Sequence, residues 1–190
     1  MSPLSNILIF YNASILGRLY AKARHWPSII SIKDGKYDLN LPRDYATIFL
    51  SEKRLWPLWY GSDFTNKVIL DVGAGAGETA SYFFNHGAKE IITIEPDALA
   101  LKYLQKNAEQ NHWPLKIIPR HFRARDLEIP YDFLKMDIEG GEVELFNASR
   151  VGPCRMELHP RITGKEASLN LIQKFSLKPI FKDKIYGVIE

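Results

Sequence analysis

Glycines and carboxylates that could bind a ligand follow directly after an apolar segment of the chain. They lie in the run DVGAGAGET, residues 71–79, which comes after the apolar residues 68–70. Glycines at alternate positions let the backbone turn tightly and approach a ligand without side-chain obstruction. We therefore predict a ligand-binding turn made by Asp71, Gly73, Ala74, Gly75, Gly77, Glu78 and Thr79.

A second acidic position, Glu95 followed by Pro96, ends the next apolar segment about twenty residues later. A carboxylate there can accept hydrogen bonds from both ribose hydroxyls of a nucleoside. Dinucleotides need the spacing Gly-x-Gly-x-x-Gly for their pyrophosphate, whereas this chain has Gly-x-Gly-x-Gly preceded by Asp71. An acid in that turn repels a pyrophosphate and suits an ammonium group. We therefore expect S-adenosylmethionine as the cofactor, in preference to a dinucleotide or to a packing turn without a ligand.

Three residues near the ends of later apolar segments are predicted to be catalytic: Asp137, Glu139 and His159. Methyl transfer from a sulfonium is an in-line displacement, in which the acceptor atom must be held about 3–3.5 Å from the methyl carbon. If the acceptor is a hydroxyl, a nearby base helps to remove its proton. Asp137 is expected to face the methyl group and so to line the cofactor site as well. The alternatives are helix capping for Glu139 and a structural role for His159.

Lys135 is unusual because it lies inside a predicted central strand, where a buried ammonium needs a partner. Glu157, on the strand expected beside it, is the partner that we predict. The alternative is that the amine of Lys135 reaches solvent along its own aliphatic stem.

The elements that position these residues alternate between strand and helix from residue 67 on. Strands are predicted at residues 67–71, 90–95, 115–119, 131–137 and 155–159, and helices at residues 77–86, 98–110, 142–147 and 165–175. Such alternation predicts an α/β fold with a doubly wound, Rossmann-like sheet of mostly parallel strands. Two last strands at residues 177–181 and 185–189, joined by a short turn, predict an antiparallel edge.

The first 65 residues have a different pattern. Apolar residues at helical spacing predict a helix that ends by residue 26, followed by a hairpin over residues 28–41 and a helix at residues 44–55. We expect residues 1–65 to be an extension or substrate cap, and residues 66–190 to be the cofactor-binding domain. Arg18, Lys22 and Arg24 leave open whether the first helix rests on a membrane surface or covers the domain.

These motifs together resemble those of class I S-adenosylmethionine-dependent methyltransferases. Residues 71–77 and 94–96 are similar to motifs I and II of that class, and an antiparallel last strand is its distinguishing edge. Within the class, FLKMDIEGGE at residues 133–142 resembles the LKxDxEGxE signature of FkbM-like methyltransferases, and MELH at residues 156–159 resembles the strand that follows it. The resemblance spans about residues 66–190 and implies methylation of a hydroxyl of a small molecule, a glycan or a lipid. The Asn-Pro-Pro-Tyr-type loop of base-amine methyltransferases is absent, which also favours oxygen as the acceptor.

The basic run at residues 120–125 supports a second hypothesis, an RNA methyltransferase. Clustered arginines bind phosphates, and Phe122 offers a stacking surface between them. This run also occupies the place where many methyltransferases read adenine, and Asp126 is the substitute that we consider for that role. A non-catalytic nucleoside-binding module is a third hypothesis.

Composition narrows the class of protein without naming a partner. The chain has 190 residues and a net charge of +3, and its single cysteine, Cys154, excludes an intramolecular disulfide framework and a cysteine-built zinc site. No His, Cys and carboxylate spacing along the chain predicts a metal site. No apolar run reaches the roughly 18–20 residues of a membrane span, and no secretory signal begins the chain, so we expect a cytoplasmic protein.

Overall fold

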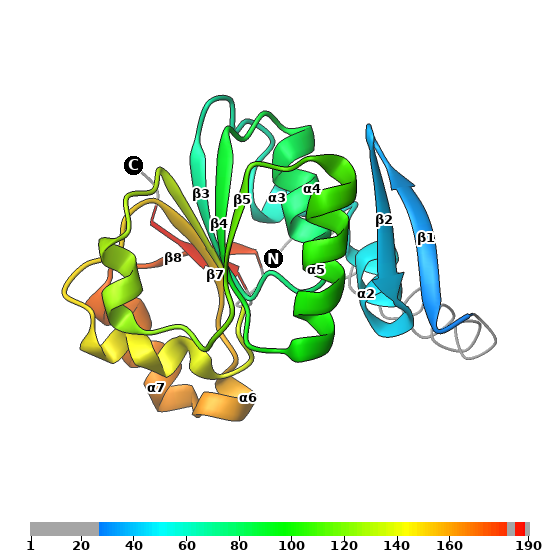
Figure 1. Ribbon diagram of the computed structural model, residues 1–190. Helices are drawn as coiled ribbons and strands as arrows, with labels where there is room; N and C mark the ends of the chain where they lie inside the picture. Colours follow the sequence, from blue (N-terminus) through cyan, green and yellow to red (C-terminus); the bar gives the residue numbers. More distant parts are fainter. Residues whose placement is uncertain (1–26, 182–184, 189–190) are drawn as a thin grey trace, which may run out of the picture.

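A seven-stranded sheet forms the centre of the computed structural model, which describes residues 27–181 and 185–188 (Figure 1). Its strand order is β5-β4-β3-β6-β7-β9-β8. The strands are β3 (Val68–Val72), β4 (Glu90–Ile94), β5 (Leu115–Ile118), β6 (Phe133–Met136), β7 (Cys154–Glu157), β8 (Lys178–Phe181) and β9 (Ile185–Gly187). Strands β3 to β7 are parallel, and β9 runs antiparallel to both β7 and β8. The predicted fold class, including the antiparallel last strand, is confirmed.

Helices cover both faces of this sheet (Figure 1). The helical segments are α4 (Glu78–Asn85), α5 (Ala98–Asn111), η1 (Ala124–Glu128), η2 (Gly141–Asn147), α6 (Pro160–Thr163) and α7 (Lys165–Lys174). The helix predicted over residues 142–147 is a 3-10 helix, η2, rather than an α-helix. Its buried residues Glu142 and Leu145, and Ala148 after it, recur every third position, which matches the three residues per turn of a 3-10 helix. Among the described residues, no helix is long and apolar enough to cross a bilayer.

Two hydrophobic cores lie on opposite faces of the sheet, because side chains alternate along each strand. Ile69, Ile91 and Phe133 belong to one core, with Phe83 of α4. The residues that follow them, Leu70, Ile92 and Leu134, belong to the other core, with Leu145 of η2 and Leu171 of α7. Apolar strands buried on both faces explain why the strand segments could be read from the sequence as apolar runs.

The residues before the sheet pack on the hydrophobic core that contains Ile69, Ile91 and Phe133. It contains β1 (Ile29–Asp34) and β2 (Tyr37–Pro42), which form a two-stranded hairpin, followed by α2 (Arg43–Glu52) and α3 (Trp56–Trp59). The hairpin lies against α5, where the buried Asn107 accepts a hydrogen bond from Asn40 N at 2.8 Å and donates one to Asn40 O at 3.1 Å (Figure 1). The helix predicted before residue 26, with its membrane hypothesis, lies outside the described residues, and the division at residue 65 stays a prediction.

Candidate functional site

A pocket of about 560 Å³ opens where β3, β4 and β6 end. Ligands of doubly wound sheets bind at this carboxyl edge of the strands. Seven of the predicted site residues line the pocket: Gly73, Gly75, Glu78, Glu95, Pro96, Asp137 and Glu139. Its other lining residues are Tyr45, Ile48, Ile94, His121, Phe122, Ile138, Gly141, Val143 and Glu144.

The glycine turn after β3 depends on residues without a side chain. Gly73, Gly75 and Gly77 all have positive φ angles, at 81°, 56° and 101°. At Gly73 a Cβ atom would lie only 1.8 Å from the backbone oxygen of Asp137, so no other residue fits between the ends of β3 and β6. The predicted residue Ala74 is buried in this turn, and the turn leaves the backbone exposed to the pocket at Gly73 and Gly75.

Glu95 ties this turn to the end of β4. Its Oε2 accepts a hydrogen bond from Gly75 N, and its Oε1 accepts one from Asp97 N, both at 2.9 Å. Burial raises the pKa of Glu95, against the effect of these two bonds. Each carboxylate oxygen has a second lone pair, so Glu95 can still accept hydrogen bonds from a ligand in the pocket.

Asp71 and Thr79 lie beneath the turn and do not line the pocket. Asp71 is fully buried; its Oδ2 accepts a hydrogen bond from Thr79 Oγ1 at 2.6 Å, and its Oδ1 lies 3.2 Å from Lys135 Nζ. Lys135 also donates to the backbone oxygen of Gly73. The predicted partner of Lys135, Glu157, was therefore wrong, because Asp71 is level with Lys135 across the β3–β6 pair. The solvent-reaching alternative was wrong too, since only 2% of the Lys135 side chain is exposed.

Glu78 stands at the start of α4, with its side chain on the pocket wall. Its Oε2 accepts a hydrogen bond from Ala76 N at 2.9 Å. Burial raises the pKa of Glu78 to about 8, although this bond and the charge of Lys135 act in the opposite direction. A cationic group in the pocket would stabilise the ionised form of this carboxyl.

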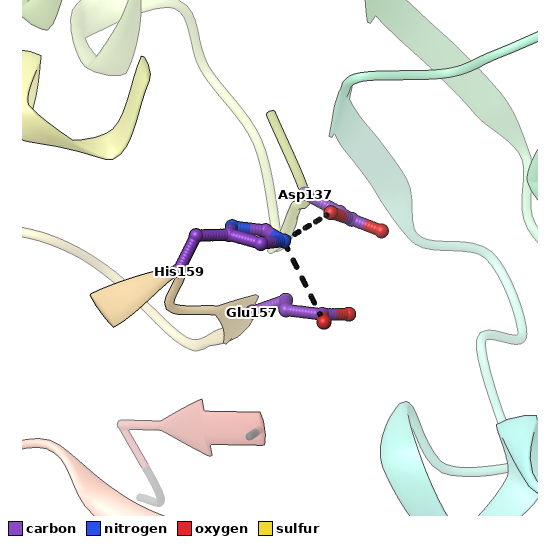
Figure 2. Close-up of side chains that lie close together, drawn as sticks. All are labelled: Asp137, Glu157 and His159. Carbon is purple, nitrogen blue, oxygen red and sulfur yellow. Dashed lines mark ion pairs between the residues drawn. The ribbon is translucent and has the colours of Figure 1, made fainter. Parts of the chain in front are cut away.

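The three predicted catalytic residues come together beside the pocket, which Asp137 and Glu139 line and His159 does not. His159 follows β7, and its Nε2 lies 3.5 Å from an oxygen of Asp137 and 3.5 Å from an oxygen of Glu139. Figure 2 shows the ring between the carboxylates of Asp137 and Glu157, and Glu157 Oε1 also lies 3.5 Å from Nε2. Sequence reasoning had assigned Glu157 to Lys135, and the topology instead brings it to His159.

A buried carboxylate, Glu142, holds His159 in this position. Its Oε1 accepts from the backbone nitrogen of His159 at 2.7 Å and lies 2.8 Å from the ring Nδ1. Burial lowers the pKa of His159, but the bond to Glu142 and the charges of Asp137 and Glu157 outweigh it and raise this pKa to about 9. The ring Nε2 of His159 therefore faces the carboxylates of Asp137, Glu139 and Glu157.

The basic run contributes to the pocket through His121, which sequence reasoning does not single out, and through Phe122, which it considers only as a stacking surface for RNA. Arg120 makes two hydrogen bonds to the carboxylate of Asp126, at 2.8 and 2.7 Å, so neither side chain extends into the pocket. His121 and Phe122, which lie between them in the sequence, line it instead. Asp126 does not line the pocket, and its oxygens accept from Arg120 and from Arg123 N, so its role in reading adenine stays a prediction.

Tyr45 and Ile48 of α2 also line the pocket. The part of the chain before the sheet therefore contributes side chains to the pocket, and its role as a substrate cap stays a prediction. The sequence did not predict that these two residues line the pocket. No pattern along the chain indicates that a helix at residues 43–52 packs beside strands that begin sixteen residues later.

The mostly parallel sheet with antiparallel β9, and the glycine turn after its central strand β3, define the fold of class I S-adenosylmethionine-dependent methyltransferases. Solved structures agree with this class. A tRNA m1G37 methyltransferase from M. jannaschii is similar over 86% of this chain and 56% of that chain, with a TM-score of 0.55 and 18% identity. Fibrillarin from Aeropyrum pernix, in complex with natively bound S-adenosyl-L-methionine, is similar over 73% of this chain and 74% of that chain, with a TM-score of 0.51 and 16% identity.

In sequence, the chain is similar to the histone-arginine methyltransferase CARMER of Drosophila willistoni, with 31% identity over 91 residues. The match covers 48% of this chain and only 16% of the relative, so the chain spans a small part of that protein's length. No family model matches the sequence. The finer resemblance to FkbM-like methyltransferases therefore stays a prediction, while the fold class is shown.

Proposed function

We propose that this chain transfers a methyl group from S-adenosylmethionine to an oxygen of its acceptor. The observation that carries the proposal is that the glycine turn, Glu95 and Asp137 all meet in one pocket at the carboxyl edge of the sheet. A site of about 560 Å³ lies within the range of small-molecule and cofactor pockets. The names of the similar proteins, all methyltransferases or a protein with this cofactor bound, support the same activity.

The cofactor's parts find matching groups along the pocket. The remaining lone pairs of Glu95 suit the ribose hydroxyls, and His121 and Phe122 offer ring faces for adenine. Glu78 suits the cationic amino group of the methionine part, because a positive charge would favour the ionised form of that carboxyl. The sulfonium and its methyl group would then lie toward Asp137.

An acid-lined pocket favours a neutral or cationic acceptor over a polyanion. Asp137, Glu139 and Glu144 line its far end, and no lysine or arginine is among its lining residues in the described part of the chain. In the reaction, the acceptor hydroxyl loses its proton to a carboxylate or to water, its oxygen forms a bond to the methyl carbon, and the carbon–sulfur bond breaks with its electron pair left on sulfur. The products are a methyl ether and S-adenosylhomocysteine.

RNA is a second acceptor class, because the similar structures include a tRNA methyltransferase. Arg123 and Arg125 are exposed and could contact phosphates, whereas Arg120 is held by Asp126. The carboxylates at the pocket end oppose this alternative, since they would repel the phosphates on either side of a target base.

Two measurements test the proposal. Calorimetry with S-adenosylmethionine, S-adenosylhomocysteine and NAD should give binding of the first two ligands only, and binding of NAD alone would refute the cofactor assignment. Transfer of a labelled methyl group to separated small-molecule, glycan, lipid and RNA fractions should then label a hydroxyl-bearing fraction other than RNA. Cofactor binding without transfer to any fraction would favour a non-catalytic nucleoside-binding module.

A further inference from the structure

We infer that Asp137, Glu157 and His159 bind a divalent metal ion beside the pocket, which Asp137 lines. Each residue offers one ligand atom, and these three atoms lie within 4.8 Å of one another (Figure 2). Sequence spacing predicted no metal site, because Asp137 is separated from Glu157 and His159 by about twenty residues, and the pairing of β6 with β7 brings them together. The metal site itself does not depend on the proposed function, but its role in methyl transfer does.

The distances around His159 Nε2 suit ligands of one ion better than partners in a hydrogen bond. Oxygens of Asp137 and Glu157 each lie 3.5 Å from Nε2. A charge-assisted hydrogen bond would be about 2.7–2.9 Å long. Two ligands bound at about 2.1 Å from an ion in tetrahedral geometry lie roughly 3.4 Å apart. The ring nitrogen thus faces the carboxylates of Asp137, Glu139 and Glu157, each at 3.5 Å, and makes a short charge-assisted hydrogen bond with none of them.

Glu142 supplies the outer support that metal-binding histidines have. It contacts the ring Nδ1 of His159 at 2.8 Å and fixes the backbone of the same residue at 2.7 Å. A carboxylate that holds Nδ1–H leaves Nε2 as the ligand atom and sets the orientation of the ring. Glu142 is fully buried, and its second oxygen has no hydrogen-bond partner among the described residues, so its charge favours a cation nearby.

The donor set indicates a first-row transition ion rather than calcium or magnesium. Two carboxylates and one imidazole suit Mn²⁺, Fe²⁺, Co²⁺ or Zn²⁺, whereas magnesium and calcium prefer oxygen ligands alone. Three protein ligands leave coordination positions open for water or substrate. Asp137 lines the pocket, so an open position on this ion can face the acceptor.

Such an ion would bind the acceptor's hydroxyl oxygen and lower its pKa, so that the proton leaves to water and the oxygen attacks the methyl carbon. The carbon–oxygen bond forms as the carbon–sulfur bond breaks, and the metal keeps its oxidation state throughout. The site therefore selects acceptors with a hydroxyl, and favours two adjacent hydroxyls that can occupy two open positions.

Titration of the full chain with metal tests this inference. Protein freed of metal with EDTA is titrated with MnCl₂, and free Mn²⁺ is followed by its electron paramagnetic resonance signal. Binding of one ion per chain is expected, and Glu157→Gln and Asp137→Asn should each weaken it at least about 10-fold. Glu144→Gln is the matched control: it removes one carboxylate of the same pocket outside the cluster, and should change the affinity less than about 2-fold. Circular dichroism of each variant verifies that it is folded.

The site is refuted if the wild-type chain binds no Mn²⁺ or Zn²⁺ up to about 1 mM. It is refuted equally if Glu157→Gln and Asp137→Asn bind as tightly as Glu144→Gln. Calorimetry with S-adenosylmethionine on the same metal-free protein separates this result from the proposed function. Loss of cofactor binding with intact metal binding would contradict the methyltransferase, and the reverse would contradict only the metal site.

Discussion

Two clusters of charged side chains lie on either side of strand β6, and they differ in how accessible they are to solvent. Asp71 and Lys135 are almost fully buried and pair with each other under the glycine turn. His159 instead contacts four carboxylates, at 2.8 to 3.5 Å, at an edge that opens on the pocket. The first cluster balances its charge internally, while the second has more acids than bases.

The solvent accessibility of the charged groups, rather than their residue type, therefore separates a structural ion pair from a reactive site. Both clusters were built from acidic residues at strand ends that the sequence marked as functional. A buried pair loses its hydration and must be satisfied by protein groups, whereas a partly exposed one can exchange protons, ions or substrate with solvent. Asp71 thus supports the turn, whereas Asp137 lines the pocket, where we propose that it acts on the acceptor.

The largest effect should come from breaking the closed cluster. Lys135→Met leaves the carboxylate of Asp71 buried without its ion-pair partner, and is expected to lower the free energy of unfolding by about 3–5 kcal/mol, measured by urea denaturation. The double variant with Asp71→Asn should recover at least about 1 kcal/mol, because it removes the unpaired charge. Lys116→Met on the exposed face of β5 is the control, with a change within about 0.5 kcal/mol. A loss no larger than this control would contradict the comparison.

Breaking the open cluster should change catalysis and leave stability nearly intact. Asp137→Asn removes the carboxylate that we propose accepts a proton or binds a metal ion, and is expected to reduce methyl transfer at least about 100-fold. Calorimetry should show a much smaller change in the affinity for S-adenosylmethionine, since the glycine turn and Glu95 are unaffected. Retained turnover would show that Asp137 does not act on the acceptor.

The pKa of Glu78, which lines the pocket and belongs to neither cluster, can be tested through the pH dependence of stability. The unfolded chain ionises this carboxyl near 4.5, and the folded chain near 8. Between these values the folded state binds more protons, so the free energy of unfolding should fall as pH rises, by up to about 1.4 kcal/mol per pH unit. Urea unfolding of wild type and Glu78→Gln across this range checks the sign. Parallel profiles for the two proteins would mean that the pKa of Glu78 is not raised.

The smallest effect is expected in the basic run, which lies outside both clusters. Exchanging the exposed Arg123 and Arg125 for glutamine should change RNA binding less than about 2-fold and leave its salt dependence unchanged, because an acid-lined pocket does not retain RNA. Fluorescence anisotropy over a series of salt concentrations measures both quantities. A shallower salt dependence in the variant would instead support the RNA alternative.

Most of the sheet could be predicted from the sequence because its strands are short apolar runs buried on both faces. Residues 68–70 are all apolar, and residues 91–94 contain three isoleucines with Thr93 as their single polar position, so the type and order of these strands follow from pattern. The glycine turn was equally readable, since positive φ angles at Gly73, Gly75 and Gly77 exclude most other residues. The 3-10 form of η2 was not, because it depends on which side chains η2 buries against its neighbours.

The sequence predicted most of the residues of the candidate site, but it did not predict which side chains contact each other. Asp137, Glu139 and His159 were identified at strand ends, and the structure brings them within contact distance of one another. The predicted partner of Lys135 was wrong. Asp71 and Glu157 both offer a carboxylate, and only the register of β3 against β6 places Asp71 beside Lys135. Tyr45, Ile48, His121 and Phe122 were missed as pocket residues, since their position depends on packing between segments distant in sequence.

The sequence by itself determined the class of fold, the ligand-binding turn and the acids at the strand ends, because these features are local: each depends on residues within about ten positions of one another. Which acid pairs with the buried Lys135, and which acids surround His159, depends on the tertiary structure. Burial and partners set the pKa and the accessibility of a charged group, and both depend on the strands and helices packed around it. That is why one pair of charges became part of the core, and the other a site for chemistry.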